Sequence, residues 1–252
     1  MAEKKKRGRV RVEPGQKRIR AVIGGKVVAQ SDNTVMVWEK PYYPTYYVPS
    51  ADVDTSLLAP SGETNRSPSR GTSELFNIKV GDQQRDNAAA WYKETPVDEI
   101  EDHIRLDWDS MDNWYEEEEE VYVHARDPYS RIDILPSSRH IRVEVDGVTV
   151  ADSRQPRLLF ETGLPTRYYL PKGDVNMELL TDSDLVTSCP YKGDANYYHV
   201  TVDGTTHENI VWWYRNPVEE SSRIAGYVSF YNEKVDIYVD GELEAKPKTV
   251  FA

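Results

Sequence analysis

The chain repeats itself at an offset of 122 residues. Residues 17–94 and 139–216 share 21 identities in 78 positions without a gap. Unrelated strand-rich segments do not keep one register over such a length, and the period is far longer than the roughly 20–50 residues of a solenoid repeat. The matched positions include Ile19 with Ile141, Gly25 with Gly147, Asp52 with Asp174, Asn87 with Asn209, and Trp91 with Trp213. The chain therefore holds two copies of one complete domain.

The repeat divides the 252 residues into four parts. We predict a basic N-terminal tail at 1–16, a first copy at 17–125, a linker at 126–138 whose prolines and serines resist regular structure, and a second copy at 139–252. Each copy has about 110 residues, a common domain size. The register breaks after residue 94, where the first copy continues into a longer, more acidic stretch that ends in the run Glu116 to Glu120. We expect the two copies to contact each other.

Short strands separated by turns predict antiparallel β structure. In the second copy, residues 141–145 alternate between apolar and polar, Asp146-Gly147 supplies a hairpin turn, and residues 148–150 resume the strand. β-Branched and aromatic residues also dominate the segments 158–160, 167–170, 197–202, 209–214, 227–231 and 235–239. Short helical pieces are possible at 97–106, 174–180 and 218–224. The predicted fold class is mainly β, with two tandem antiparallel domains of sandwich, barrel or tent type.

Charge and composition exclude several classes of partner and site. The chain carries 43 acidic and 31 basic residues, a net charge of −12, which argues against nucleic acid as a partner of the whole protein. No apolar run approaches the roughly 20 residues that cross a bilayer, and no apolar segment follows the basic start to make a secretory signal. The single cysteine excludes an internal disulfide and a multi-cysteine zinc site. We expect a cytoplasmic protein that needs no metal or cofactor and does not contact membranes.

The basic N-terminus, from Lys4 to Arg20, is the one positive patch of the sequence. It predicts a solubilising tail that leads into a strand at residues 9–12. The alternatives are contact with nucleic acid, with the chain's own acidic run, or with an acidic loop of a partner. That run, without the spacing of a calcium loop, is typical of a solvated loop.

The segment from Ser188 to Gly193 carries the candidate chemistry. Cys189 stands three residues before Lys192, whose positive charge would favour the thiolate. His199 or His207 could serve as a base. The alternative is structural, because a lone cysteine is usually a small buried hydrophobe.

Aromatic residues recur on successive predicted strands. Neighbours along a strand point to opposite faces, so about half should build the core and half could line a cleft for a flat ring or an acyl group. A cation beside a glycine in each copy would suit an anionic ligand. The predicted ligand-binding residues are Tyr168, Tyr169, Pro190, Lys192, Gly193, Tyr198, Trp213 and Tyr214. Their first-copy equivalents are Tyr46, Tyr47, Ser67, Arg70, Gly71, Trp91 and Tyr92.

With these motifs the chain resembles the bacterial family known as domain of unknown function 427. The second copy carries nearly the full pattern: Tyr168-Tyr169-Leu170-Pro171, Asp174-Val175, Thr187-Ser188-Cys189-Pro190-Tyr191-Lys192-Gly193, Tyr197-Tyr198, Trp213-Tyr214-Arg215-Asn216-Pro217 and Phe230-Tyr231. The first copy is degenerate, because Ser67 and Arg70 replace the cysteine and lysine.

The resemblance implies a β-tent fold, also seen in the ligand-binding domain of cereblon and in methionine sulfoxide reductase B. The paired cysteines that hold zinc in those relatives are missing from this chain. A nucleotidyltransferase label is also attached to the family, but the sequence shows no triad of metal-binding carboxylates to support it.

Three functions stay open. The leading hypothesis is a small-molecule-binding protein whose intact, aromatic-lined site lies in the second copy. The alternative is an enzyme that uses Cys189 and Lys192, or one with nucleotidyltransferase-type activity. The third is an interaction module that binds through its acidic run and basic tail.

Overall fold

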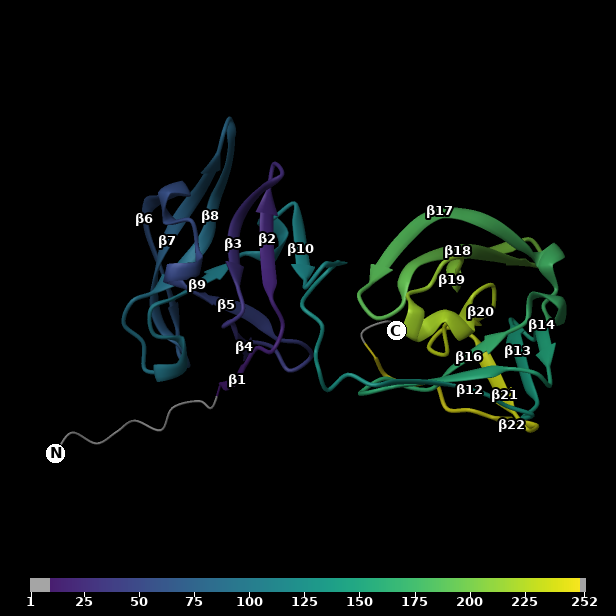
Figure 1. Ribbon diagram of the computed structural model, residues 1–252. Coiled ribbons are helices and arrows are strands. Elements are labelled where there is room, and N and C mark those ends of the chain that lie inside the picture. Colours follow the sequence, from purple (N-terminus) through teal and green to yellow (C-terminus); the bar gives the residue numbers. More distant parts are fainter. Residues whose placement is uncertain (1–9, 250–252) are drawn as a thin grey trace. The chain divides into compact units, whose positions relative to one another are not determined.

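The computed structural model describes residues 10–249. The chain consists of two compact units, and the boundary between them along the sequence falls between Asp127 and Pro128 (Figure 1). Within the described residues, each unit holds one seven-stranded and one four-stranded antiparallel sheet. Every one of these sheets is open, with two edge strands, so none closes into a barrel. The prediction of two tandem, mainly β domains is confirmed. Across residues 10–249, every helical segment is too short to cross a bilayer.

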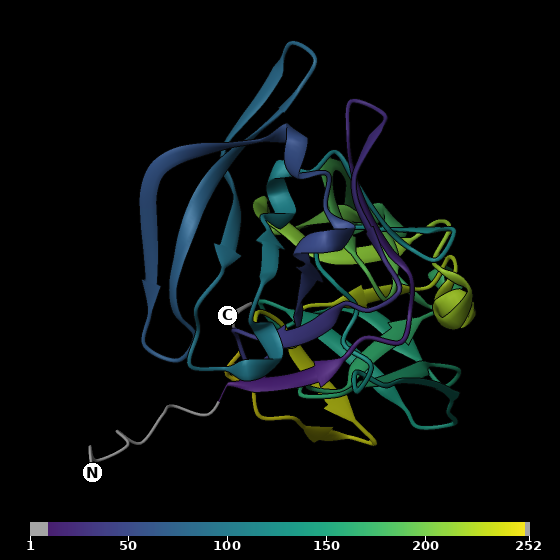
Figure 2. The same cartoon turned by 60° about the vertical axis from the view of Figure 1, so that its left-hand side comes forward.

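The first unit, residues 1–127, is built from eleven described strands. They are β1 (Arg11–Pro14), β2 (Ile19–Ile23), β3 (Lys26–Ser31), β4 (Val35–Trp38), β5 (Thr45–Pro49), β6 (Leu58–Ser67), β7 (Gly71–Val80), β8 (Gln83–Tyr92), β9 (His103–Leu106), β10 (Asn113–Glu116) and β11 (Glu119–Val121). The larger sheet has the order β1-β4-β5-β9-β8-β7-β6 and the smaller one β11-β10-β2-β3. The long strands β6, β7 and β8 lie side by side (Figure 2).

The second unit, residues 128–252, repeats this plan with eleven described strands. They are β12 (Ile132–Pro136), β13 (Ile141–Val145), β14 (Val148–Ser153), β15 (Arg157–Glu161), β16 (Arg167–Leu170), β17 (Leu180–Cys189), β18 (Gly193–Val202), β19 (Thr205–Tyr214), β20 (Val228–Phe230), β21 (Asp236–Val239) and β22 (Glu242–Leu243). The larger sheet has the order β12-β15-β16-β20-β19-β18-β17, and the smaller β14-β13-β21-β22. Each strand thus has its counterpart in the first unit, as the duplication requires.

The segments assigned to the tail and the linker each end in a strand. β1 pairs with β4 through Val12 and Val37, and β12 pairs with β15 through Ile134 and Leu159. The expectation of irregular structure is wrong for residues 132–136. Of the linker's prolines, Pro128 lies before the strand and Pro136 stands at the last position of this edge strand, where a missing N–H is tolerated. The basic residues before position 10 lie outside the described range.

Helical structure is limited to short 3-10 turns. They are η1 (Ser50–Asp52), η2 (Thr55–Leu57), η3 (Asp98–Ile100), η4 (Trp108–Ser110), η5 (Lys172–Asp174), η6 (Met177–Leu179) and η7 (Glu219–Ile224). The predicted helix at 97–106 is wrong beyond η3, because residues 103–106 form β9. In that strand Ile104 and Leu106 alternate into the core with His103 and Arg105 between them.

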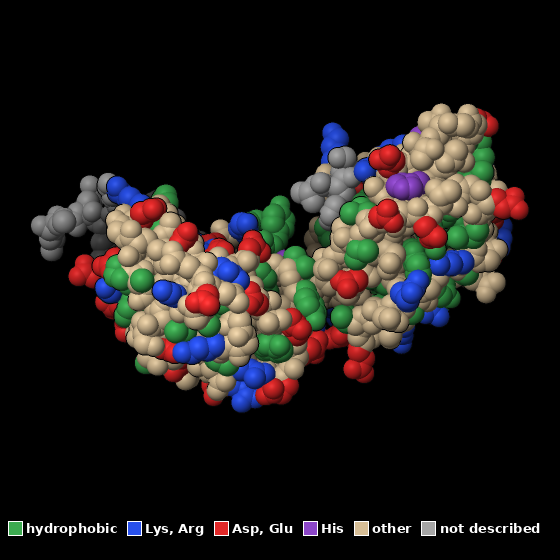
Figure 3. Space-filling model, turned by 90° about the horizontal axis from the view of Figure 1, so that it is seen from above, with side chains coloured by type: hydrophobic (Ala, Val, Ile, Leu, Met, Phe, Trp, Pro, Cys, Tyr) green, Lys and Arg blue, Asp and Glu red, His purple; other side chains and the backbone are tan. Residues whose placement is uncertain are grey.

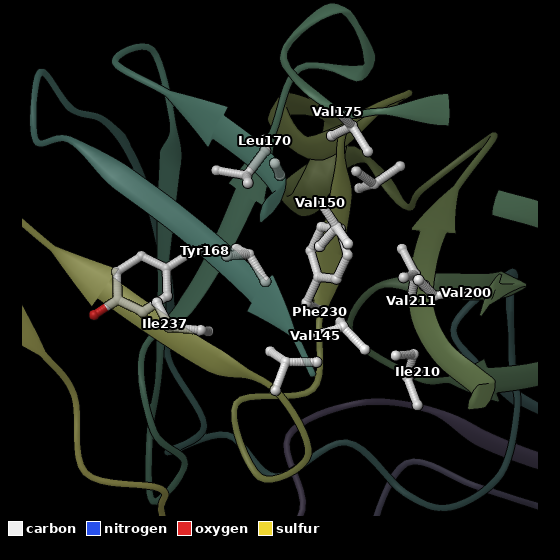
Figure 4. Packing of buried hydrophobic residues seen from close by; sticks show 14 of the residues in the cluster. Val145, Val150, Tyr168, Leu170, Val175, Val200, Ile210, Val211, Phe230 and Ile237 are labelled. Atoms are coloured by element: carbon white, nitrogen blue, oxygen red, sulfur yellow. The ribbon is translucent and has the colours of Figure 1, made fainter. Parts of the chain in front are cut away.

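Each larger sheet is buried on both faces. In the second unit, one face packs against the smaller sheet through Tyr168, Leu170 and Phe230, with Val150 and Ile237 opposite them (Figure 4). The other face forms a separate cluster of Leu159, Tyr169, Tyr197, Trp212 and Tyr214, to which Ile134 of β12 and Ile224 of η7 add. Adjacent aromatic residues therefore do point to opposite faces, and both sets are buried.

The acidic run is part of the first unit's smaller sheet. Its residues form the hairpin of β10 and β11, and Glu116 is buried. Lys17, Arg18 and Arg20 form ion pairs with Glu116, Glu117 and Glu118. The run therefore forms a hairpin that contacts the chain's own basic segment, and the side chains of Glu117, Glu118 and Glu119 stay exposed to solvent. On the face shown in Figure 3, basic and acidic side chains are interspersed.

Candidate functional site

The Cys-Pro-Tyr-Lys-Gly segment forms the turn between β17 and β18. Lys192 extends from this turn to Glu161 at the end of β15, with 2.5 Å between Nζ and Oε2. The two side chains are only 12% and 9% exposed. The first unit repeats the pair as Arg70 and Glu39 at 3.1 Å. The ion pair recurs in both copies. In the second unit it connects the β17–β18 turn to β15, and in the first unit Arg70 connects the β6–β7 turn to Glu39, which follows β4.

Gly193 lies close to another backbone segment of the same chain. Its φ is +93°, a conformation that side chains rarely adopt, and a Cβ there would lie 3.3 Å from the carbonyl oxygen of Asn216. The amide of Val218 donates a hydrogen bond to the carbonyl of Lys192 across the same contact. The chain's own segment 216–218 therefore occupies the space beside this glycine.

Cys189 lies opposite Gly193 at the end of β17 and is partly exposed. His199 lies six residues along β18 from Gly193, the ladder partner of Cys189, a separation of roughly 20 Å at the rise of a strand. His207 is bonded to Asp146. Neither histidine is placed to act as a base on the thiol.

Two tyrosine hydroxyls lie near this turn on the second face of the sheet. Burial raises the pKa of Tyr169 well above its usual value, and the negative charge of Glu161 adds to the shift. Burial likewise raises the pKa of Tyr214, with Tyr169 and Cys189 as the next contributors. Both phenols stay protonated at neutral pH, so they can donate hydrogen bonds but not act as bases.

The predicted ligand-binding residues separate onto the two faces of the larger sheet. Tyr169 and Tyr214 belong to the second face, on the same side as Lys192. Tyr168, Tyr198 and Trp213 pack with the first-face cluster. The eight residues therefore do not surround one space.

The surroundings of Trp213 differ most between the two units. Its ring stacks on Tyr198, with centroids 6.0 Å apart and planes inclined by 12°. Lys172 of η5 lies over the ring, with Nζ 3.6 Å from its centroid, and donates to the Tyr198 hydroxyl at 2.9 Å. Arg215 lies on the same ring at 5.5 Å. The indole nitrogen Nε1 is buried and has no hydrogen-bond partner among the described residues.

In the first unit a carboxylate occupies this position. The indole of Trp91 donates to Asp102 Oδ1 at 2.9 Å, and the hydroxyl of Ser50 donates to Oδ2 at 2.7 Å. The hydrogen bond from Ser50, followed by that from Trp91, lowers the pKa of Asp102 below its usual value. Asp102 is therefore ionised at neutral pH and satisfies both donors.

Gly226 is the counterpart of Asp102. The amide of Asp102 donates to the carbonyl of Tyr92, and that of Gly226 donates to the equivalent Tyr214. Both residues have a positive φ, of 55° and 74°. A Cβ at Gly226 would contact no atom within 4 Å. In the first unit the Asp102 side chain extends from this position. In the second unit the space next to the Gly226 Cα is unoccupied.

Sequence comparison missed Lys172, Arg215 and Gly226 as site residues. The replacement of Ser50 by Lys172 is visible at the constant offset, and so is that of Lys93 by Arg215. Gly226 lies beyond the break in the register, where no fixed offset pairs it with Asp102. The hydrogen bonds of the two tyrosine carbonyls are what establish that equivalence.

Among residues 10–249, surface hollows lie away from Trp213, including one of about 390 Å³ lined by residues 27–30 and 51–54. Another, of about 580 Å³, is lined by Lys17, Val121, Arg126 and the acidic residues 116–119. A third, of about 220 Å³, is lined by Tyr168 among others, whose hydroxyl donates to Glu244 at 2.5 Å. Across residues 10–249, no three His, Cys, Asp or Glu side chains are grouped so that they could hold a metal ion.

Comparison with known proteins gives one family. A family model described as "Domain of unknown function (DUF427)" matches residues 11–117 and again residues 133–241, and its short name carries a nucleotidyltransferase label. The two matches begin in β1 and β12 and cover most of the chain. No curated protein matches the sequence.

Proposed function

The chain belongs to the family of domain of unknown function 427, in two tandem copies, and we propose that its second unit binds a small molecule at Trp213. The first unit fills the corresponding position with its own Asp102 side chain. The proposal rests on one observation: glycine replaces that aspartate in the second unit, and the space beside Gly226 is open.

Tyr198, which is buried, and Trp213, over which Lys172 lies, form a parallel aromatic stack. Such stacks suit planar rings, because aromatic faces bury large areas at little entropic cost. Both residues belong to the set predicted from the sequence. The first-unit counterpart, Phe76 and Trp91, is inclined by 48° and does not form a parallel stack. A parallel aromatic stack is therefore present in the second unit, which we propose to bind a ligand, and not at the equivalent position of the first.

The other predicted roles stay predictions. Lys192 and Gly193 have structural partners that account for their burial, and the thiol-enzyme alternative for Cys189 would need a base other than His199 or His207. The cytoplasmic location, the bacterial origin and the contact between the two copies also stay predictions.

A thermal-shift screen of nucleobases, nucleotides and acyl compounds tests the proposal. We expect hits that raise the melting temperature of the wild-type chain and of the Trp91→Leu variant, but not of Trp213→Leu. The two variants remove equivalent rings from the two units, so each controls for the general cost of losing a tryptophan. Hits that protect Trp213→Leu as well as the wild type would place binding elsewhere, and a screen without hits would contradict the proposed function.

A further inference from the structure

The charges around Trp213 indicate what kind of molecule the second unit binds. In the first unit, Lys93 lies 4.9 Å from the centre of the Trp91 ring and forms an ion pair with Glu74 at 2.7 Å. Asp102 adds a second carboxylate to the same ring. The first-unit site therefore holds one cation and two carboxylates.

The second unit has lost both carboxylates and gained a cation. Asn196 takes the position of Glu74, since each pairs with the site tryptophan across the neighbouring strand. Gly226 takes the position of Asp102, and Lys172 that of Ser50. Among residues 10–249, neither Lys172 nor Arg215 forms an ion pair with a carboxylate. Two cations thus lie on one indole ring, and among the described residues no carboxylate is within ion-pair distance of either.

The buried indole N–H of Trp213 also indicates that the second unit lacks an acceptor at this position, and this observation does not depend on charge. A buried donor without a partner costs free energy, and native proteins rarely leave one. Trp213 Nε1 is such a donor, and its equivalent in Trp91 donates to a carboxylate oxygen. The position missing an acceptor is thus the one that a carboxylate occupies in the sister unit.

We propose that the second unit binds the carboxylate group of a small ligand, which takes the place of the Asp102 side chain and is held by Trp213 Nε1 and Lys172 Nζ. This inference rests on the proposed function and assigns the class of ligand. One oxygen of the carboxylate accepts from the indole and the other from the ammonium, as the two oxygens of Asp102 accept from Trp91 and Ser50. Lys172 leaves the Tyr198 hydroxyl to make this contact, and Arg215 adds long-range attraction.

A carboxylate fits this donor set better than a phosphate does. The first unit presents two donors to two oxygens, and the second unit presents two donors at equivalent positions. A phosphate has further oxygens that would need donors, and anion sites for phosphate usually supply them from several backbone amides or an arginine fork.

Amide–nitrogen correlation spectra of the full chain, titrated with benzoate or benzamide, test the inference. The chain has six tryptophans, so the indole region is simple, and Trp213→Phe identifies the relevant signal. Benzoate should move the Trp213 indole signal downfield in a saturable way and bind at least about tenfold more tightly than benzamide, because a hydrogen bond to a charged acceptor is the stronger one. The Trp91 signal should stay in place, since Asp102 already holds it.

Variants of the two cations complete the test. Lys172→Met should weaken benzoate about tenfold and leave benzamide unchanged, whereas Lys93→Met in the first unit should change neither. Equal binding of benzoate and benzamide, unaffected by Lys172→Met, would overturn the carboxylate assignment and leave the proposed function standing. Tighter binding of inorganic phosphate than of benzoate would reassign the ligand class. No movement of the Trp213 signal with either probe would overturn the inference, whatever the thermal-shift screen finds.

Discussion

Replacing Lys192 with methionine is expected to destabilise the second unit by about 3–5 kcal/mol, the usual cost of leaving one partner of a buried ion pair without the other. Glu161 is 9% exposed and would lose the ammonium 2.5 Å from its oxygen. Lys192→Arg should cost less than about 1 kcal/mol, because the first unit makes the same connection with Arg70 and Glu39.

Hydrogen exchange of the full chain measures this effect unit by unit. Peptides from β15, β17 and β18 should exchange faster in Lys192→Met, while the first unit serves as the internal reference. Combining Lys192→Met with Glu161→Leu should restore much of the protection, because the uncompensated charge is gone. If these peptides exchange at the same rate in Lys192→Met as in the wild type, the ion pair does not hold the turn. Lys192 would then again be a candidate binding residue.

Trp212→Ala should have an effect of similar size, about 3–5 kcal/mol, through loss of packing. Trp212 lies 4.7 Å from Tyr231 between ring centroids, and its indole donates to the Tyr169 hydroxyl at 3.0 Å. Its cross-strand neighbour is Ser229, which is fully buried. The alanine would leave a large cavity on the second face of the sheet.

The first unit shows how that cavity can be filled in another way. It has Ala90 at the position of Trp212, and Arg105 at the position of Ser229. Arg105 donates to Glu39 at 3.1 Å. Trp212→Ala combined with Ser229→Arg should therefore be more stable in chemical unfolding than Trp212→Ala alone. A double variant less stable than the single one would contradict the equivalence of the two solutions.

The duplication and the strand pattern could be predicted because they rest on local signals. The alternation at residues 141–145 and the Asp146-Gly147 turn gave β13 and β14 directly. The predicted strand at residues 9–12 overlaps β1 (Arg11–Pro14). The strand β12 could not be recognised in this way, because its hydrophobic partners lie on β15 and the segment itself is short and ends in proline.

The site could be predicted only in part. Tyr198 and Trp213 stand out as aromatic residues of the motif, and the sequence places them correctly on neighbouring strands. The contrast between Asp102 and Gly226 could not be seen, because the loops before β9 and β20 differ in length and shift the register. The burial of Lys192 likewise depends on Glu161, thirty-one residues earlier in the chain, and only the folded sheet brings the two together.

The indole N–H signal of Trp213 in the Gly226→Asp variant tests the central claim most directly. An aspartate at this position supplies the second unit with the carboxylate that Asp102 supplies to the first, and the backbone there accepts it, because Asp102 itself has a φ of 55°. The Trp213 signal should then move downfield toward that of Trp91 without any added ligand, and benzoate should no longer bind. An unmoved signal, together with undiminished benzoate binding, would contradict the account.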